Sequence, residues 1–246
     1  MRTIVEKMKE KTKLLVSIRS IEEAAAVNGL KIDIIDLKEP KNGPTGMLDF
    51  IDIKNIVSAL RDNKFYGKIS TTFELNKGHI SRNDIAKIED LVTLGLDYIK
   101  VGVSADMNTW GDLLKFTDIL NEIKTKVLEN KLILVLMITR KPSLNIIKNI
   151  PPSGVVKFSG IMVDTLNKES GSIFDILNLT ELQIIKKAAL ENNVDFGIAG
   201  SLDASHTSLI NQLQPNWAGF RGGVCLKERS GPLSRLRLEN LIDSFC

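Results

Sequence analysis

A carboxylate and an amine lie two residues apart near the end of an early apolar run. This run carries Asp36, Leu37 and Lys38 in succession. In an extended strand alternate side chains share a face, so Asp36 and Lys38 would lie together, opposite Leu37. A neutral amine attacks carbonyl carbons, and a neighbouring carboxylate can carry the protons that this chemistry moves.

Two later apolar runs add similar groups. Lys100 lies within the run 98–103, and the run 160–165 ends with Asp164 and Thr165, with Lys168 just beyond it. Crowding of ammonium groups in a partly dry pocket favours the neutral form of one amine. Together with carboxylates, this is typical of Schiff-base chemistry on sugar phosphates. Taken singly, each lysine would fit a solvated charge or a surface ion pair.

Glycines lie at the ends of the last two apolar runs. Gly200 and Ser201 end the first of these runs, and Arg221, Gly222 and Gly223 end the second. Glycine lets backbone N–H groups approach an anion, and the arginine would add a fork of donors, so the segments predict a phosphate site. The alternative is that the glycines only make tight turns. The chain has no dinucleotide or P-loop fingerprint, which disfavours a nucleotide enzyme.

Short apolar runs alternate with amphipathic stretches along the whole chain. We expect strands at 14–18, 33–38, 68–73, 98–103, 132–138, 160–165, 195–201 and 217–223. Helices are expected at 21–29, 49–61, 81–95, 109–129, 144–149, 179–192, 204–213 and 234–245. Eight such units predict an α/β fold, a parallel eight-stranded (β/α)₈ TIM barrel, with an open doubly wound sheet as the alternative. The phosphate site and the charged residues would then meet at the C-terminal mouth.

Length and composition limit the class of protein. The 246 residues fit a single barrel domain over 1–246, with 1–13 as a polar N-terminal extension. A net charge of +3 and 5% aromatic residues predict no nucleic-acid partner. The chain has no apolar run of the ~18 residues that cross a bilayer and no secretory leader, so we expect a cytoplasmic protein. Two cysteines and two histidines without ligand spacing predict no metal.

Five segments, in order, resemble one known family. They are 33–46, 96–103, 163–175, 197–202 and 220–225, and they resemble (5-formylfuran-3-yl)methyl phosphate synthase, which opens the furan branch of methanofuran biosynthesis. The resemblance implies a class I aldolase-like barrel that converts two molecules of glyceraldehyde 3-phosphate into the furan aldehyde phosphate, as a phosphate-eliminating lyase without a cofactor. The ends of the third and fifth runs, 72–75 and 136–140, depart from the family's pattern.

The resemblance also assigns roles to residues. It implies that Lys38 forms the Schiff base and that Lys100 accepts a proton, while other charged residues assist proton transfers, namely Asp36, Asp164 and Lys168. The phosphate would be held by Gly200, Ser201, Arg221 and Gly222. Two alternatives stay open: another class I sugar-phosphate aldolase or isomerase, and a catalytically silent barrel that binds a phosphorylated metabolite. We expect a homo-oligomer, because barrels of this size commonly associate through their outer helices.

Overall fold

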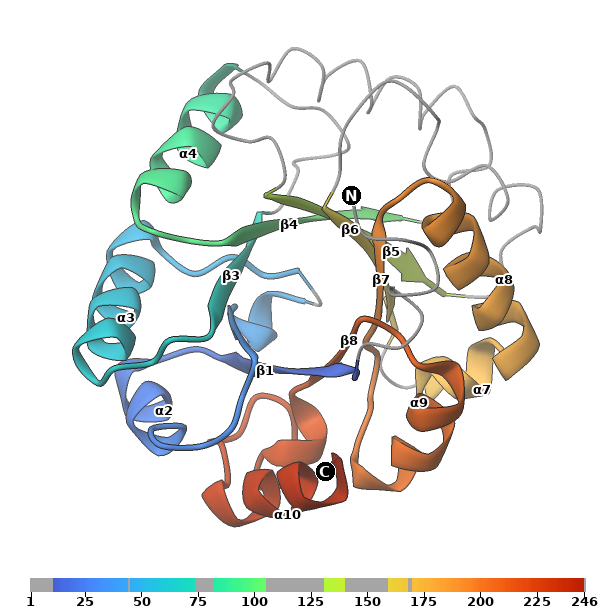
Figure 1. Ribbon diagram of the computed structural model, residues 1–246. Coiled ribbons are helices and arrows are strands. Elements are labelled where there is room, and N and C mark those ends of the chain that lie inside the picture. Colours follow the sequence, from blue (N-terminus) through green and yellow to red (C-terminus); the bar gives the residue numbers. More distant parts are fainter. Residues whose placement is uncertain are drawn as a thin grey trace.

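Eight parallel strands form a closed barrel in the order β1-β2-β3-β4-β5-β6-β7-β8, with β8 pairing back onto β1 (Figure 1). The computed structural model describes residues 11–43, 45–73, 82–104, 131–139, 159–167 and 170–245. The strands are β1 (Lys13–Ile18), β2 (Ile34–Leu37), β3 (Lys68–Phe73), β4 (Tyr98–Ser104), β5 (Leu132–Ile138), β6 (Gly160–Thr165), β7 (Asp195–Ile198) and β8 (Trp217–Phe220). The predicted barrel is confirmed, and the open sheet is excluded.

The last two strands end three residues earlier than predicted. After β7 the backbone of Gly200 has a φ of +107° and that of Ser201 a φ of +48°, which an extended strand does not allow. After β8 the chain forms a 3₁₀ turn, η5 (Gly222–Val224). The glycine segments are therefore loops at the barrel mouth and not strand ends.

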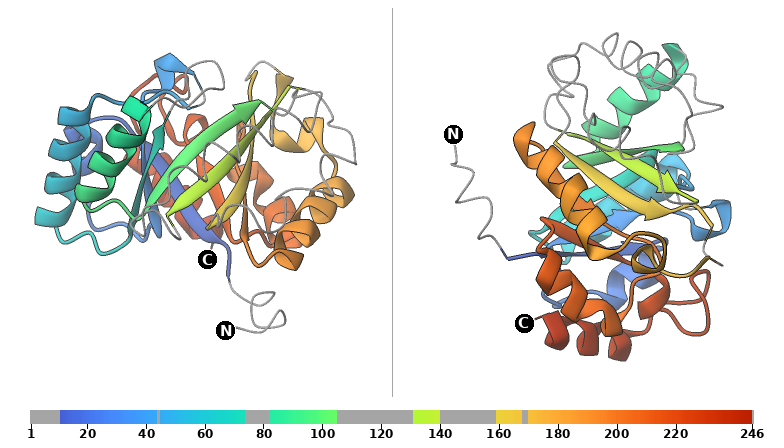
Figure 2. Two further views of the ribbon diagram at one scale, coloured as in Figure 1. Left: turned by 90° about the horizontal axis from the view of Figure 1, so that it is seen from above. Right: turned by 90° about the vertical axis from the view of Figure 1, so that its right-hand side faces the viewer.

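Helices form an outer layer around the strands (Figure 2). They are α2 (Ile21–Ala26), α3 (Phe50–Asp62), α4 (Arg82–Thr93), α7 (Ile173–Ile176), α8 (Leu179–Glu191), α9 (Thr207–Leu213) and α10 (Arg235–Phe245), with 3₁₀ turns η1 (Pro40–Asn42) and η4 (Ala204–His206). The Ser20 side chain accepts the Glu23 N–H at the start of α2, as an N-cap does. The short α7 was not predicted, because one turn is too brief to show periodicity. The predicted helices at 109–129 and 144–149 and residues 1–10 lie outside the described residues.

The strands bury apolar side chains on both faces. One large cluster fills the space between barrel and helices, and a smaller one fills the barrel interior. Trp217 belongs to the interior cluster and covers Gly160 and Gly197; a Cβ at Gly197 would lie 1.8 Å from its Nε1. These glycines therefore make room for the indole. Apolar side chains thus fill the barrel interior around Trp217.

In the part of the chain that the structure describes, three polar side chains at the N-terminal edge accept a backbone N–H from a neighbouring strand. Each stands directly before an even-numbered strand and accepts a backbone N–H from the preceding strand: Asp33 from Leu14 at 2.8 Å, Asp97 from Ile69 at 3.0 Å, and Asn216 from Phe196 at 2.8 Å. We call these contacts edge clamps. They join β1 to β2, β3 to β4 and β7 to β8.

The corresponding position before β6 is Ser159. Its N–H donates to the Leu132 carbonyl at 2.8 Å, just as the clamp residues donate to their partners. Its Oγ, however, is buried without a hydrogen-bond partner among the described residues. Serine is shorter than aspartate or asparagine, so the side-chain half of the clamp is missing between β5 and β6.

Within the described part of the chain, no helix is both long and apolar enough to span a bilayer.

Candidate active site

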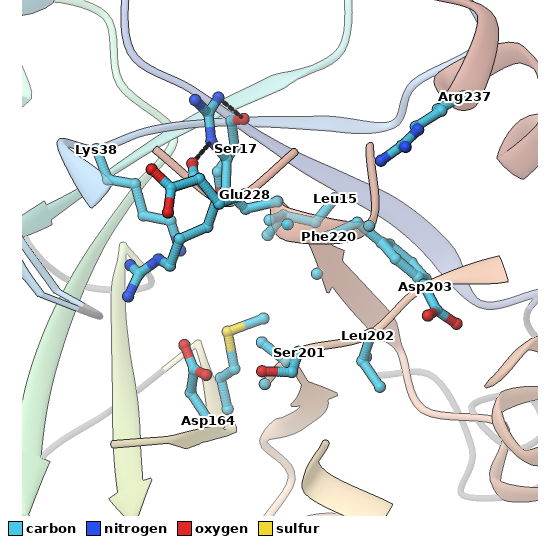
Figure 3. A pocket seen from close by; sticks show the side chains of 18 of the residues that line it. Leu15, Ser17, Lys38, Asp164, Ser201, Leu202, Asp203, Phe220, Glu228 and Arg237 are labelled. Carbon is cyan, nitrogen blue, oxygen red and sulfur yellow. Dashed lines mark hydrogen bonds between the residues drawn. The ribbon is translucent and has the colours of Figure 1, made fainter. Parts of the chain in front are cut away.

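A cavity of about 440 Å³ opens at the C-terminal ends of the strands (Figure 3). Its walls come from several strands and from the loops that follow β7 and β8. A volume of this size suits a small-molecule ligand. The charged residues that line it are Lys38, Lys100, Asp164, Asp203, Arg221, Lys227, Glu228, Arg229 and Arg237.

Asp36 lies fully buried beside the cavity, at the centre of a hydrogen-bond network. Its carboxylate accepts from Ser17 Oγ at 3.0 Å, from Ser70 Oγ at 2.8 Å and from Lys100 Nζ at 2.6 Å. Burial alone would raise the pKa of Asp36, but the charges of Lys100 and Lys38, with the hydrogen bonds, hold it below its usual value. The carboxylate is therefore ionised at neutral pH.

The two lysines around Asp36 differ in their attachment. Lys100 comes from the interior face of β4, is almost fully buried and forms an ion pair with Asp36. Lys38 follows the end of β2, where its N–H still donates to the Ile18 carbonyl at 3.1 Å, so the chain stays extended. Both lysines line the cavity, and Lys38 lies near enough for its charge to act on the Asp36 carboxylate that Lys100 contacts, as the alternation around Leu37 predicts.

Asp164 faces the same space from β6. Its side chain is buried and lines the cavity, and Figure 3 shows it extending towards the region that Lys38 enters from β2. The structure thus assembles four of the five charged residues that the sequence singled out. The fifth, Lys168, lies outside the described residues.

The glycine loops line the wall formed by β7 and β8. Gly200 packs closely on β6, since a Cβ there would lie 2.7 Å from Thr165 Cγ2, and the exposed Ser201 follows it with a positive φ. Gly222 and Gly223 begin the turn η5. All four residues border the cavity, so their backbone can approach a bound anion.

Arg221 differs from its predicted orientation. All five of its N–H donors bond to the protein: Nε to the Arg229 carbonyl at 2.9 Å, and the two Nη atoms to Glu23, the Ser17 carbonyl and the Gly231 carbonyl. Glu23 is a buried residue of α2, 198 positions away in the sequence. Arg221 therefore braces the loop after β8 instead of presenting its donors to the cavity.

Sequence reasoning missed the charged residues of the loop after β8 and the start of α10. Lys227, Glu228, Arg229 and Arg237 all line the cavity. Arg237 donates to the Cys225 carbonyl, and Arg229 Nη2 donates to the Gly43 carbonyl at 2.9 Å. The available signal was a cluster of basic residues directly after the predicted phosphate loop.

Solved structures share this architecture. Phosphoribosyl anthranilate isomerase from Thermus thermophilus superimposes with a TM-score of 0.63 at 10% identity, covering 95% of this chain and 98% of its own. 3-Hexulose-6-phosphate synthase from Salmonella typhimurium gives 0.58 at 13% identity, with 96% and 100% coverage. At these identities the likeness shows the fold alone. Fold and site together define a TIM-barrel protein with a charged cavity at the strand ends.

Sequence comparison narrows this class to one family. The model of the 4-HFC-P synthase family matches residues 14–242. The chain belongs to this family of enzymes, the (5-formylfuran-3-yl)methyl phosphate synthases. The enzyme of that name from Archaeoglobus fulgidus is 28% identical over 240 residues, covering 94% of this chain and 98% of the relative. That from Methanosarcina barkeri is 28% identical over 233 residues, covering 94% and 97%.

Proposed function

We propose that the protein condenses two molecules of glyceraldehyde 3-phosphate into (5-formylfuran-3-yl)methyl phosphate, with release of one phosphate and two molecules of water, in methanofuran biosynthesis. The observation that carries the proposal is the grouping of Lys38, the Asp36–Lys100 ion pair and Asp164 at the same cavity as the glycine loops. Membership of the family supplies the reaction. The arrangement supports a Schiff-base route to it.

Lys38 is the proposed Schiff-base residue. The Nζ of Lys100 is held 2.6 Å from Asp36, whereas Lys38 reaches the cavity from just beyond the end of β2. A fixed cation nearby favours the neutral, nucleophilic form of an amine. The amine of Lys38 would add to the carbonyl of the ketone isomer of one triose phosphate, and loss of water would give the imine.

Carbon–carbon bond formation follows. The second glyceraldehyde 3-phosphate loses a proton and then its phosphate, which leaves the enol of pyruvaldehyde. The terminal carbon of this enol attacks the imine carbon on Lys38, which becomes the ring position that carries the phosphorylated methyl group. The free hydroxyl of the former ketone then closes onto the pyruvaldehyde ketone with loss of water, and elimination of the Lys38 amine frees the enzyme and gives the aromatic furan. We assign the proton transfers to Asp164 and Lys100, with Asp36 holding the Lys100 amine and Lys168 as a further predicted carrier.

The direct test is incubation of the purified protein with glyceraldehyde 3-phosphate. Furan aldehyde is detected by its ultraviolet band and mass, and released phosphate is measured alongside. Lys38→Ala should abolish the product. Lys41→Ala is the matched control, because Lys41 is an exposed lysine of η1, three residues away, and should keep full activity. Undiminished furan formation by Lys38→Ala would contradict the assignment.

Borohydride trapping separates the alternatives. With the triose phosphate, the proposed enzyme gives a reduced adduct that peptide mass mapping places on Lys38. An adduct without furan product would indicate another class I aldolase or isomerase. Neither adduct nor product would indicate a silent barrel that binds a phosphorylated metabolite.

A homo-oligomer is also proposed. The support is apolar surface on the outer helices: Phe50 and Ile51 of α3 are 43% and 66% exposed, and Leu236 of α10 is 68% exposed. Light scattering coupled to size exclusion measures the mass directly. A monomer at micromolar concentration would contradict this proposal.

A further inference from the structure

Two arginines of the loop after β8 line the cavity, and they differ in how many of their donors the protein uses. Arg221 bonds all five N–H groups to protein acceptors. The partly buried Arg229 makes one side-chain hydrogen bond, from Nη2 to the Gly43 carbonyl, and no ion pair within the described part of the chain. A guanidinium carries five donors in a fixed fork that matches phosphate oxygens. Arg229 thus retains donors for a ligand.

The surroundings of Arg229 leave its charge incompletely balanced. Burial lowers the pKa of Arg229, and the charges of Asp164 and Glu39 oppose this effect while that of Arg221 adds to it. Among the residues that the structure describes, neither Asp164 nor Glu39 forms an ion pair with the Arg229 guanidinium. A cation that is partly removed from water without a contacting anion is stabilised when an anionic ligand arrives.

Arg229 also stands where a substrate phosphate is expected. A Cβ on Gly222 would lie 3.6 Å from the Arg229 Cβ, so the side chain starts beside the glycine turn η5. Its tip reaches Gly43 in the loop that follows Lys38. The Arg229 side chain therefore runs along the cavity wall from the glycine turn η5 to the loop that follows Lys38.

The loop that carries Arg229 is held in place by the first arginine. Arg221 Nε donates to the Arg229 carbonyl at 2.9 Å, and its Nη2 donates to the Gly231 carbonyl at 3.1 Å. These bonds fix the backbone on both sides of Ser230. One arginine thus fixes the loop backbone, and the other presents its donors to the cavity.

We propose that Arg229, positioned by Arg221, is a substrate-binding residue that holds a phosphate group of the triose phosphate next to Lys38. This inference deepens the proposed function and rests on it for the identity of the ligand. It moves the phosphate-binding role that the sequence predicted for Arg221 to a residue eight positions later.

Inorganic phosphate is the first probe, measured by calorimetry. Arg229→Gln should weaken phosphate binding by about tenfold or more, since a hydrogen bond to a charged group contributes ~1.5–3 kcal/mol. Arg229→Lys keeps the charge without the fork and should give an intermediate affinity. Arg235→Gln is the matched control, because Arg235 is exposed, bonds to Glu239 and does not line the cavity. Its phosphate affinity should equal that of the unmodified protein.

Borohydride trapping distinguishes phosphate binding from a structural role. Arg229→Gln should raise the concentration of dihydroxyacetone phosphate needed for half-maximal trapping by about tenfold. Trapping by dihydroxyacetone, which lacks the phosphate, should not change. Equal losses for both ligands would show that Arg229 acts only through its contact with Gly43, and unchanged phosphate affinity would also overturn the inference.

These results are separable from failure of the proposed function. If the unmodified protein forms neither furan nor adduct, the Schiff-base proposal fails, but the calorimetric comparison of Arg229→Gln with Arg235→Gln still decides the role of Arg229. If Arg229→Gln does not fold, Arg229→Lys decides it: an affinity for phosphate equal to that of the unmodified protein would overturn the inference.

Discussion

The buried ion pair between Lys100 and Asp36 makes a strong prediction about stability. Lys100→Met removes the ammonium while keeping a side chain of similar length. It leaves a fully buried carboxylate that retains hydrogen bonds from Ser17 and Ser70 but loses its 2.6 Å partner. Breaking a buried pair in this way costs ~3–5 kcal/mol. Lys100→Met should lose that much free energy of unfolding.

The chain offers a matched control at the N-terminal edge. Lys68 contacts Asp97 at the same 2.6 Å, but the lysine side chain is 58% exposed, against 6% for Lys100. Exposed pairs contribute ~0–1 kcal/mol, because water solvates both charges when the pair is broken. Lys68→Met should therefore cost at most about 1 kcal/mol. The same substitution at the same contact distance thus isolates the effect of burial.

The free energy of unfolding that Lys100→Met loses should also depend on pH. In the unmodified protein the pKa of Asp36 is held below its usual value, so its stabilising contribution is present above about pH 4 and is lost as the pH falls below that. Without Lys100, burial opposes ionisation with only Lys38 and the hydroxyls to offset it, and the pKa rises. Protonation then relieves the penalty, so the stability difference between variant and unmodified protein should narrow from pH 7 towards pH 4.

Urea unfolding followed by circular dichroism at pH 7 and pH 4.5 measures these differences. Adding Asp36→Asn to Lys100→Met should restore part of the loss, because the buried charge is then gone. Equal losses for Lys68→Met and Lys100→Met, or a difference that widens in acid, would refute the reasoning.

Two further predictions concern packing and the strand edge. Gly197→Ala should lower the melting temperature strongly, because the added Cβ would lie 1.8 Å from Trp217 Nε1 and overpacking costs ~1–3 kcal/mol or more. Gly219→Ala is the control, since the nearest contacts of its Cβ would be at 3.3 Å, and it should lower the melting temperature far less. The opposite order of the two melting temperatures would contradict the packing argument. Ser159→Asp should add the missing edge clamp to the Leu132 N–H and raise the free energy of unfolding, measured in urea, by ~0.5–1.5 kcal/mol. A destabilised variant would show that the position does not accept the longer side chain.

The barrel fold could be predicted from the sequence because the strands are buried on both faces. Runs such as 132–138 consist almost entirely of Ile, Leu, Val and Met, and a parallel barrel covered by helices requires this composition. Strand ends were less readable where the chain leaves the sheet through backbone torsions. Gly200 and Ser201 look like a continuation of β7 in the sequence but turn away through positive φ angles.

The charged residues were readable in part. The spacing of Asp36 and Lys38 in an extended strand places both at one end of the barrel, and the structure agrees. The ion-pair partner of Arg221 could not be predicted from the sequence, because Glu23 lies 198 positions away and the contact depends on how α2 packs against the loop after β8. Arg229 was missed for a related reason: only the closed barrel brings it beside Gly43.

The edge clamps have a consequence for amide hydrogen exchange. They occur at the β1–β2, β3–β4 and β7–β8 interfaces, where the side chain before the second strand holds a backbone N–H of the first. When the N-terminal edge opens transiently, the clamped pairs should part last. The backbone amides of Leu14, Ile69 and Phe196 would then exchange with solvent more slowly than their position at strand beginnings suggests, whereas the Leu132 amide, which faces Ser159 in place of a clamp residue, would exchange faster than these three.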